Sequence, residues 1–178
     1  MSRLIEGSIA EGGHIVDDAW VFAESMDAVA TAPSDASIVV PLSLWTVDRD
    51  ALVARGTPLG VRLPPDTDPA AVAGDLSHWS LVEVEFPKFT DGRGYSIARL
   101  LRERFGYQGA LRAVGDVLRD QIFYLLRCGF DGFAMKHADH LEAALSAYRD
   151  FSEAYQTAVD RKTPLFARRA PIASGAAS

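Results

Sequence analysis

The sequence predicts an α/β protein in which about five consecutive β-α units form a parallel sheet. From residue 37 onward, short apolar runs of strand length alternate with segments of helical periodicity. The loops between them are short, which is typical of parallel strands joined by right-handed crossovers, with helices covering the sheet. Five units are too few to close an eight-unit barrel. We therefore expect either a half-barrel-like sheet or an open doubly wound sheet.

The strand candidates are continuous apolar runs of buried character. The first, SIVVPLSLW, is interrupted by Pro41. The five predicted strands are 37–45, 58–66, 80–86, 109–115 and 131–136.

The helix candidates follow these runs and carry apolar stripes at helical spacing. In the second, Asp68 is expected as the N-cap and Pro69 at the first helical position. The fourth is expected to end at Gly129. The five predicted helical segments are 47–56, 67–79, 94–106, 116–129 and 139–156.

The two ends of the chain differ from this repeat. The β-leaning runs RLIE and HIVDDAWVFA, separated by GSIAEGG, predict a small β hairpin cap over 1–36. The segment 161–178 is rich in Pro, Arg, Ala and Ser, which predicts a flexible tail. We therefore expect one α/β domain over 1–160, with the β-α repeat over 37–160.

Composition argues against several classes of function. The formal net charge of -6 argues against nucleic acid or an anionic membrane as the general partner. With no leader and no long apolar run, the chain is expected to be cytoplasmic. Cys128 is the only cysteine, which excludes an internal disulfide, a Cys-x-x-Cys pair and a four-cysteine cluster. No cofactor is evident from the sequence.

Ligands of parallel α/β sheets bind at the carboxyl ends of the strands. The loop after the third predicted strand, PKFTDGRGYS, is the most informative of these positions. Gly92 and Gly94 allow a ligand to approach the main chain, and the helix beginning near Tyr95 points free N–H groups at the loop. Arg93 can grip an oxyanion with two hydrogen bonds, and Lys88 adds a point charge. This pattern suits a small oxyanion.

A structural interpretation of the same loop stays open beside the first. In it, Asp91 pairs with Arg93 and the glycines only turn the chain, while Asp116 caps the helix that follows it. In the ligand interpretation, Lys88, Arg93 and Lys136 converge on one rim. The anion- or substrate-binding candidates are Lys88, Gly92, Arg93, Gly94, Tyr95, Ser96 and Lys136, and the acid–base candidates are Asp91 and Asp116. Other strand-end loops offer Ser43 and Arg62.

Three further patterns in the sequence are incomplete. Gly92-x-Gly94 lacks the third glycine of a dinucleotide fingerprint, because position 97 is Ile. The spacing of His137, Asp139 and His140 suits a metal, but no Glu-x-x-His or cysteine partner supports it, so no metal site is expected. A triad of Ser96, His137 and Asp116 lacks a Gly-x-Ser-x-Gly elbow.

The block FPKFTDGRGYSIARLLRERFGYQGALRAVGDVLRDQIFYLLRCGFDGF (86–133), with DDAW (17–20) and VPLSLW (40–45), resembles the bacterial domain-of-unknown-function family 934. The resemblance spans roughly residues 3–160. It implies an oxidoreductase involved in sulfite reduction, within sulfate assimilation and cysteine biosynthesis. Genes of this family tend to lie beside those for sulfite reductase and phosphoadenylyl-sulfate reductase, so the sulfite reductase haemoprotein and the second enzyme are the implied partners. The resemblance brings no catalytic residues.

The residues themselves offer no redox motif, although an autonomous oxidoreductase needs an electron carrier. The resemblance therefore leaves two forms of the role open, an oxidoreductase or an accessory partner of sulfite reductase. The alternatives are an enzyme acting on a small anionic substrate at the carboxyl ends of the strands, or a non-catalytic scaffold.

Overall fold

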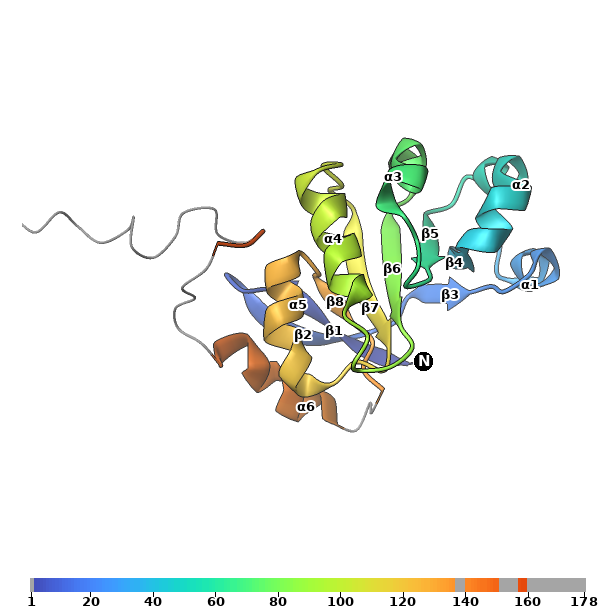
Figure 1. Cartoon of the computed structure of the whole chain (residues 1–178). Coiled ribbons are helices and arrows are strands. Elements are labelled where there is room, and N and C mark those ends of the chain that lie inside the picture. Colours follow the sequence, from blue (N-terminus) through green and yellow to red (C-terminus); the bar gives the residue numbers. More distant parts are fainter. Residues whose placement is uncertain (1, 137–139, 151–156, 160–178) are drawn as a thin grey trace, which may run out of the picture.

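The computed structural model describes residues 2–136, 140–150 and 157–159 of the chain. They form a mixed sheet of eight strands in the order β2-β1-β8-β7-β6-β5-β4-β3 (Figure 1). The strands are β1 (Arg3–Ser8), β2 (Gly12–Asp17), β3 (Trp20–Phe22), β4 (Ser37–Pro41), β5 (Leu59–Leu63), β6 (Leu81–Phe86), β7 (Ala110–Gly115) and β8 (Gly132–Phe133). The helices are α1 (Met26–Thr31), α2 (Leu42–Ala54), α3 (Pro69–Val72), α4 (Arg93–Glu103), α5 (Ile122–Cys128) and α6 (Leu141–Ala144), with the 3-10 helices η1 (Ala73–His78), η2 (Arg119–Gln121) and η4 (Leu145–Arg149).

The strand order selects the half-barrel-like alternative. The strands from β3 to β8 are parallel and lie side by side in chain order, whereas a doubly wound sheet reverses its order at a switch point. The prediction of a wholly parallel sheet of five units was wrong. The strand β3 adds a parallel strand, and the N-terminal hairpin joins the sheet because β1 pairs antiparallel with β8. This pairing covers an edge that would otherwise expose its hydrogen-bonding groups.

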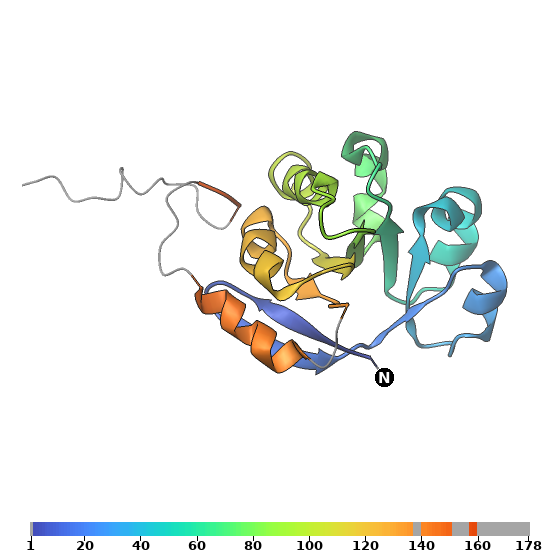
Figure 2. The same ribbon diagram turned by 60° about the horizontal axis from the view of Figure 1, so that its bottom comes forward.

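A short connection requires the sheet to curl. The edge strands β2 and β3 are joined by residues 18–19 alone. Eight flat strands would separate the two edges by about 34 Å, at a spacing of about 4.8 Å per strand, and two connecting residues reach only about 11 Å. The curl is visible in Figure 2.

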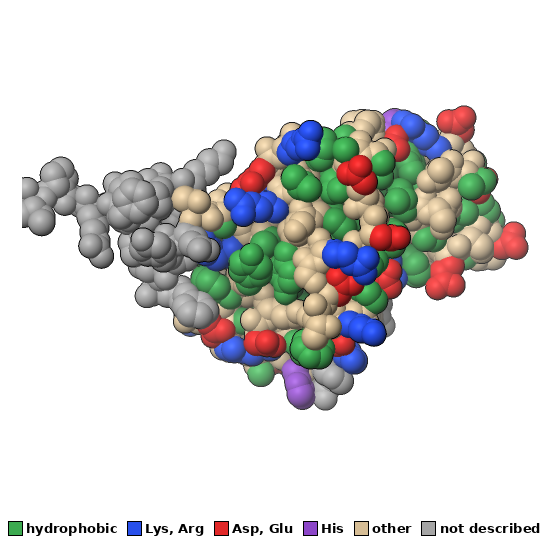
Figure 3. All heavy atoms as spheres, in the orientation of Figure 1, with side chains coloured by type: hydrophobic (Ala, Val, Ile, Leu, Met, Phe, Trp, Pro, Cys, Tyr) green, Lys and Arg blue, Asp and Glu red, His purple; other side chains and the backbone are tan. Residues whose placement is uncertain are grey.

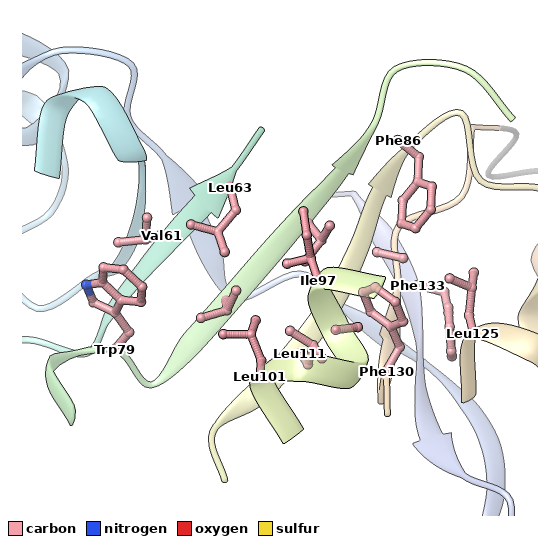
Figure 4. Packing of buried hydrophobic residues seen from close by; sticks show 14 of the residues in the cluster. Val61, Leu63, Trp79, Phe86, Ile97, Leu101, Leu111, Leu125, Phe130 and Phe133 are labelled. Atoms are coloured by element: carbon pink, nitrogen blue, oxygen red, sulfur yellow. The ribbon is translucent and has the colours of Figure 1, made fainter. Parts of the chain in front are cut away.

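The helices pack on one face of the curled sheet, and their apolar side chains form one core with it. Ile97 and Leu101 of α4 lie over Leu111 of β7, and Leu125 of α5 lies near Phe133 of β8 (Figure 4). All of these side chains are almost completely buried. We call the opposite face, which carries no helix of the described residues, the open face.

Several element boundaries differ from the predicted ones. The first predicted strand continued to residue 45, but β4 ends at Pro41 and α2 begins at Leu42. Proline lacks the N–H that a strand donates, and its fixed φ suits the residue before a helix. Trp45 is therefore helical, and its Nε1 donates to Asp75 Oδ2 at 3.0 Å.

Four other predicted segments are shorter or more irregular than expected, whereas β7 and α4 lie close to the predicted 109–115 and 94–106. The second helix is a single α turn followed by η1, and the fourth begins as η2 before α5. The fifth strand is reduced to Gly132–Phe133. Of the predicted helix 139–156, the part that the structure describes consists of α6 and η4. The predicted tail 161–178 lies outside the described residues. No helix of the described residues is long and apolar enough to cross a membrane.

Candidate functional site

The predicted anion-binding loop connects β6 to α4 and is held by the loop after β7. The N–H of Phe89 donates to Asp116 Oδ2 at 3.3 Å. Gln121 Nε2 donates both to the carbonyl oxygen of Phe89, at 2.9 Å, and to the Tyr95 hydroxyl, at 3.1 Å. These contacts fix the position of the loop against η2 and α4.

Within this loop, Arg93 binds Asp91. Its Nε and Nη2 donate to the two carboxylate oxygens at 3.0 and 2.7 Å, and its backbone N–H donates to Oδ1 at 3.1 Å. The side-chain hydrogen bonds from Arg93, and then the backbone one, lower the pKa of Asp91 to about 2. The Asp91 carboxylate thus lies at the N-terminus of α4, where the ligand interpretation placed an external anion.

The second cation of the predicted rim is also paired. Lys136 Nζ lies 3.0 Å from Asp116 Oδ1, while the N–H of Asp116 donates to the carbonyl oxygen of Phe86 at 2.7 Å. Asp116 therefore links the carboxyl ends of β6, β7 and β8. It lies before the first helical residue, Arg119, so it is not the N-cap of η2, which is Leu118.

The remaining predicted residues occupy different surroundings. Gly94 is buried, and a Cβ there would lie 2.5 Å from Cζ of Phe86, whereas a Cβ at the exposed Gly92 would make only an ordinary contact with Tyr95. The Tyr95 ring packs against Phe86 and Tyr124, with centroid distances of 5.4 and 5.1 Å. Ser96 is exposed in the first turn of α4.

The structure thus brings the predicted residues together as two separate ion pairs, Asp91–Arg93 and Asp116–Lys136. Lys88 is exposed, and its side chain has no ion pair with any described residue. The catalytic and binding roles of these residues stay predictions.

A row of charged residues crosses the open face and was not expected. The register places Arg62 of β5 beside Glu83 of β6, and Glu83 beside Arg112 of β7. Arg62 Nε donates to Glu83 Oε2 at 2.8 Å, and Arg112 Nη1 donates to Glu83 Oε1 at 3.3 Å. Glu83 and Arg112 are each 3% exposed.

Arg112 also binds the N-terminal part of the chain. Its Nη1 donates to Oδ1 of Asp18, in the connection between β2 and β3, at 3.1 Å, and its Nη2 lies 3.7 Å from Oε1 of Glu6 in β1. Gly132 separates Arg112 from Glu6 in the register, and a Cβ at Gly132 would lie 3.3 Å from Cγ of Arg112. We call Arg62, Glu83, Arg112, Asp18 and Glu6 the charged row.

The charged row leads to a hollow at the carboxyl ends of β3, β4, β5 and β6. We call it the mouth hollow, and its volume is about 340 Å³. Arg62 is common to the row and the hollow, and its Cζ lies 3.7 Å from the ring centroid of Phe22. The lining includes Phe22, Glu24, Pro41, Ser43, Arg62 and Glu85.

Sequence reasoning placed Arg62 and Ser43 at strand ends but did not single out Glu83, Glu85 or Arg112. A signal for them existed in the strands LVEVEF and ALRAVG, where charged and apolar residues alternate. Parallel strands covered by helices on both faces are almost continuously apolar. This alternation therefore indicates a face without helices.

The described residues contain no group of three or more His, Cys, Asp or Glu side chains that could hold a metal ion. His137 and Asp139 of the histidine pattern lie outside the described residues. Cys128 is buried on α5, and desolvation raises the pKa of its thiol. A buried thiol with a raised pKa is a poor nucleophile.

The model of a family described as "Bacterial protein of unknown function (DUF934)" matches residues 60–166, more than half of the chain. The match contains the whole block 86–133 on which the resemblance rests and extends into the predicted tail. The shorter motifs 17–20 and 40–45 precede it. A comparison with curated proteins finds no match.

Proposed function

The chain belongs to this bacterial family, DUF934, and from that membership we propose that it acts in sulfite reduction as a partner of the sulfite reductase haemoprotein. The pathway is the one that the family resemblance implies. The choice of an accessory partner over a separate enzyme is supported by the loop between β6 and α4.

The observation that carries this choice is the internal pairing of the loop. Arg93 is held by Asp91 through two hydrogen bonds, and Lys136 lies within 3.0 Å of Asp116. A small oxyanion that used these cations would have to displace a carboxylate from each of them. A protein partner can instead contact the loop as it stands.

The same loop presents apolar surface in a fixed position. Phe89 is 55% exposed and Tyr124 of α5 is 56% exposed. Gln121 and Tyr95 join them, because Gln121 binds both Phe89 and Tyr95, and the Tyr95 ring packs on Tyr124. We call Phe89, Tyr95 and Tyr124 the aromatic patch. Hydrophobic side chains gather over α4 and α5 in Figure 3.

Exposed aromatic residues are enriched among the side chains that dominate binding energy at protein interfaces. A patch whose loop is already held by hydrogen bonds loses little conformational freedom on binding, which favours affinity. The aromatic patch is therefore the surface we assign to the reductase.

A deletion strain tests the pathway. We expect it to grow on sulfide or cysteine but poorly on sulfate or sulfite as the sole sulfur source, and the wild-type gene should restore growth. Normal growth of the deletion strain on sulfite would contradict a role in sulfite reduction.

Binding of the purified haemoprotein tests the mode of action. The double variant Phe89→Ala/Tyr124→Ala should bind at least about tenfold more weakly in calorimetry, because truncating an aromatic hot spot typically costs about 2 kcal/mol or more. Val47→Ala is the matched control, since Val47 on α2 is 80% exposed but lies outside the patch. The same calorimetric titrations are made with phosphoadenylyl-sulfate reductase, the second implied partner.

The remaining alternatives make different predictions in the same strain. An enzyme acting on a small anion should fail when Lys88→Ala and Arg93→Ala are combined, while the aromatic variant complements the deletion. A non-catalytic scaffold should tolerate both sets of substitutions. Either outcome would replace the partner role proposed here.

A further inference from the structure

We propose that the mouth hollow binds a small amino acid in its zwitterionic form. This inference is independent of the reductase partnership, because it concerns a different site from the aromatic patch. The hollow lies at the carboxyl ends of four parallel strands, where this class of sheet binds its ligands. Its volume of about 340 Å³ falls at the small end of the range for ligand pockets.

Arg62 provides the group that would bind the carboxylate. Its Nε is engaged by Glu83 at 2.8 Å, and Phe22 lies against its guanidinium plane at 3.7 Å. Its two terminal nitrogens make no hydrogen bond to any described residue, and the side chain is 28% exposed. A guanidinium fixed on two sides with free terminal N–H groups is already oriented for a bidentate contact with a carboxylate.

Glu85 provides the group that would bind the ammonium. It lies two residues beyond Glu83 on β6, so both side chains point to the open face, and its Cα lies about 6.6 Å nearer the mouth. Among the described residues, the side chain of Glu85 has no hydrogen bond or ion pair, and Arg62 pairs with Glu83 instead. Glu24 adds a second carboxylate to the lining.

The hollow thus holds opposite charges that do not neutralise each other. A simple anion would suit the free N–H groups of Arg62 but be repelled by Glu85 and Glu24, and a simple amine would suit the carboxylates but leave those N–H groups without an acceptor. An α-amino acid carries its carboxylate and ammonium on one carbon, so it satisfies both groups at once. Phe22 and Pro41 supply apolar contacts for a small side chain, and Ser43 offers a hydroxyl.

Calorimetry on the full chain at neutral pH tests this assignment. The probes are glycine, L-alanine, L-serine and L-cysteine, with propionate and ethylamine as analogues of alanine that lack the ammonium and the carboxylate. We expect at least one amino acid to bind with a dissociation constant of millimolar or below. The matching analogues should bind at least tenfold more weakly. Failure of all four amino acids, or binding of propionate or ethylamine as tight as that of the amino acid that binds best, overturns the proposal.

Variants locate the site. Glu85→Gln removes a charge that has no partner among the described residues, so the fold should be retained and amino-acid binding should fall at least tenfold. Arg62→Lys keeps a cation beside Glu83 but loses the bidentate geometry, and it should weaken binding similarly. Glu142→Gln, which breaks the exposed pair between Arg3 of β1 and Glu142 of α6, is the control. Unchanged amino-acid binding by Glu85→Gln excludes this site. Loss of haemoprotein binding by the variant Phe89→Ala/Tyr124→Ala bears only on the partner role.

Discussion

Two glycines in the loop before α4 show how the surroundings of one residue decide its role. Both belong to the pattern that suggested close approach of a ligand. A side chain at Gly94 would collide with the buried ring of Phe86, whereas one at Gly92 would meet only Tyr95 Cδ2 at 4.0 Å. At Gly94 the close approach is therefore between the helix and the sheet.

We predict that Gly94→Ala destabilises the protein and that Gly92→Ala changes its stability by less than about 1 kcal/mol. Overpacking against Phe86 costs about 1–3 kcal/mol, which the higher helix propensity of alanine offsets by about 1 kcal/mol. Urea denaturation measures both differences. Equal stabilities of the two variants would contradict the packing role of Gly94.

The Asp91–Arg93 pair gives a prediction about pH. Because the folded-state pKa of Asp91 is lowered to about 2 from the ordinary value of 3.8, its stabilising contribution is present above pH 3.8 and is lost as the pH falls towards 2. An NMR titration of the Asp91 carboxyl should show this low midpoint. In Arg93→Ala the midpoint should rise towards the ordinary value, and Arg99→Ala, which breaks the exposed pair with Glu103, should leave it unchanged.

At the scale of elements, Tyr107 joins the end of α4 to two strands. Its hydroxyl donates to the carbonyl oxygen of Trp79, which precedes β6, at a distance of 3.1 Å. The same hydroxyl lies 3.3 Å from the carbonyl oxygen of Ala110 in β7. Tyr148 of η4 is equally buried, but its hydroxyl has no partner within the described part of the chain. The two tyrosines therefore form a natural comparison.

We expect Tyr107→Phe to lower the free energy of unfolding by about 1 kcal/mol, the usual contribution of one hydrogen bond. Tyr148→Phe should be neutral or stabilising, because it removes a buried hydroxyl without a partner. Burial raises the pKa of both phenols, so their contribution to stability should be constant below pH about 10 and fall above it. Thermal melts from pH 8 to 11 check this, and a smaller loss of stability at high pH is expected in both variants.

The alternation of strands and helices was predictable, because apolar periodicity reflects local geometry. Their boundaries depended on tertiary contacts. Pro41 ends β4 four residues before the apolar run ends. The register of β1 with β8 pairs Ile5 with Phe133 and Glu6 with Gly132, and nothing local in those short segments specifies so distant a partner.

For the candidate site, sequence reasoning identified the loop between β6 and α4 and its charged residues. It left open whether Arg93 binds a ligand or Asp91, because residue type does not reveal which contact forms. The charged row was missed for another reason. Its members are far apart in the sequence, and only the register brings Arg62, Glu83 and Arg112 into contact.

At the scale of the whole molecule, Arg112 joins the N-terminal hairpin, the connection before β3 and the middle of the sheet. It is 3% exposed and lies against Glu83, Asp18 and Glu6. Glu83 is equally buried. Removing the guanidinium of Arg112 would therefore leave the negative charge of Glu83 less well compensated.

We predict that Arg112→Ala lowers the free energy of unfolding by about 3–5 kcal/mol, as expected when one partner of a buried ion pair is removed. The control is Arg3→Ala, which breaks the exposed pair with Glu142 and should cost less than about 1 kcal/mol. Urea denaturation followed by circular dichroism measures both. Similar values for the two variants would show that the charged row does not hold the sheet together.

The pairing of β1 with β8 also has a consequence during synthesis of the chain. Ile5 leaves the ribosome long before its partner Phe133, which follows it 128 residues later in the chain. Until then, one side of β1 has no partner strand, and a free strand edge invites association with other chains. Nascent chains stalled before residue 132 should therefore depend more on chaperones than chains released after β8 has emerged.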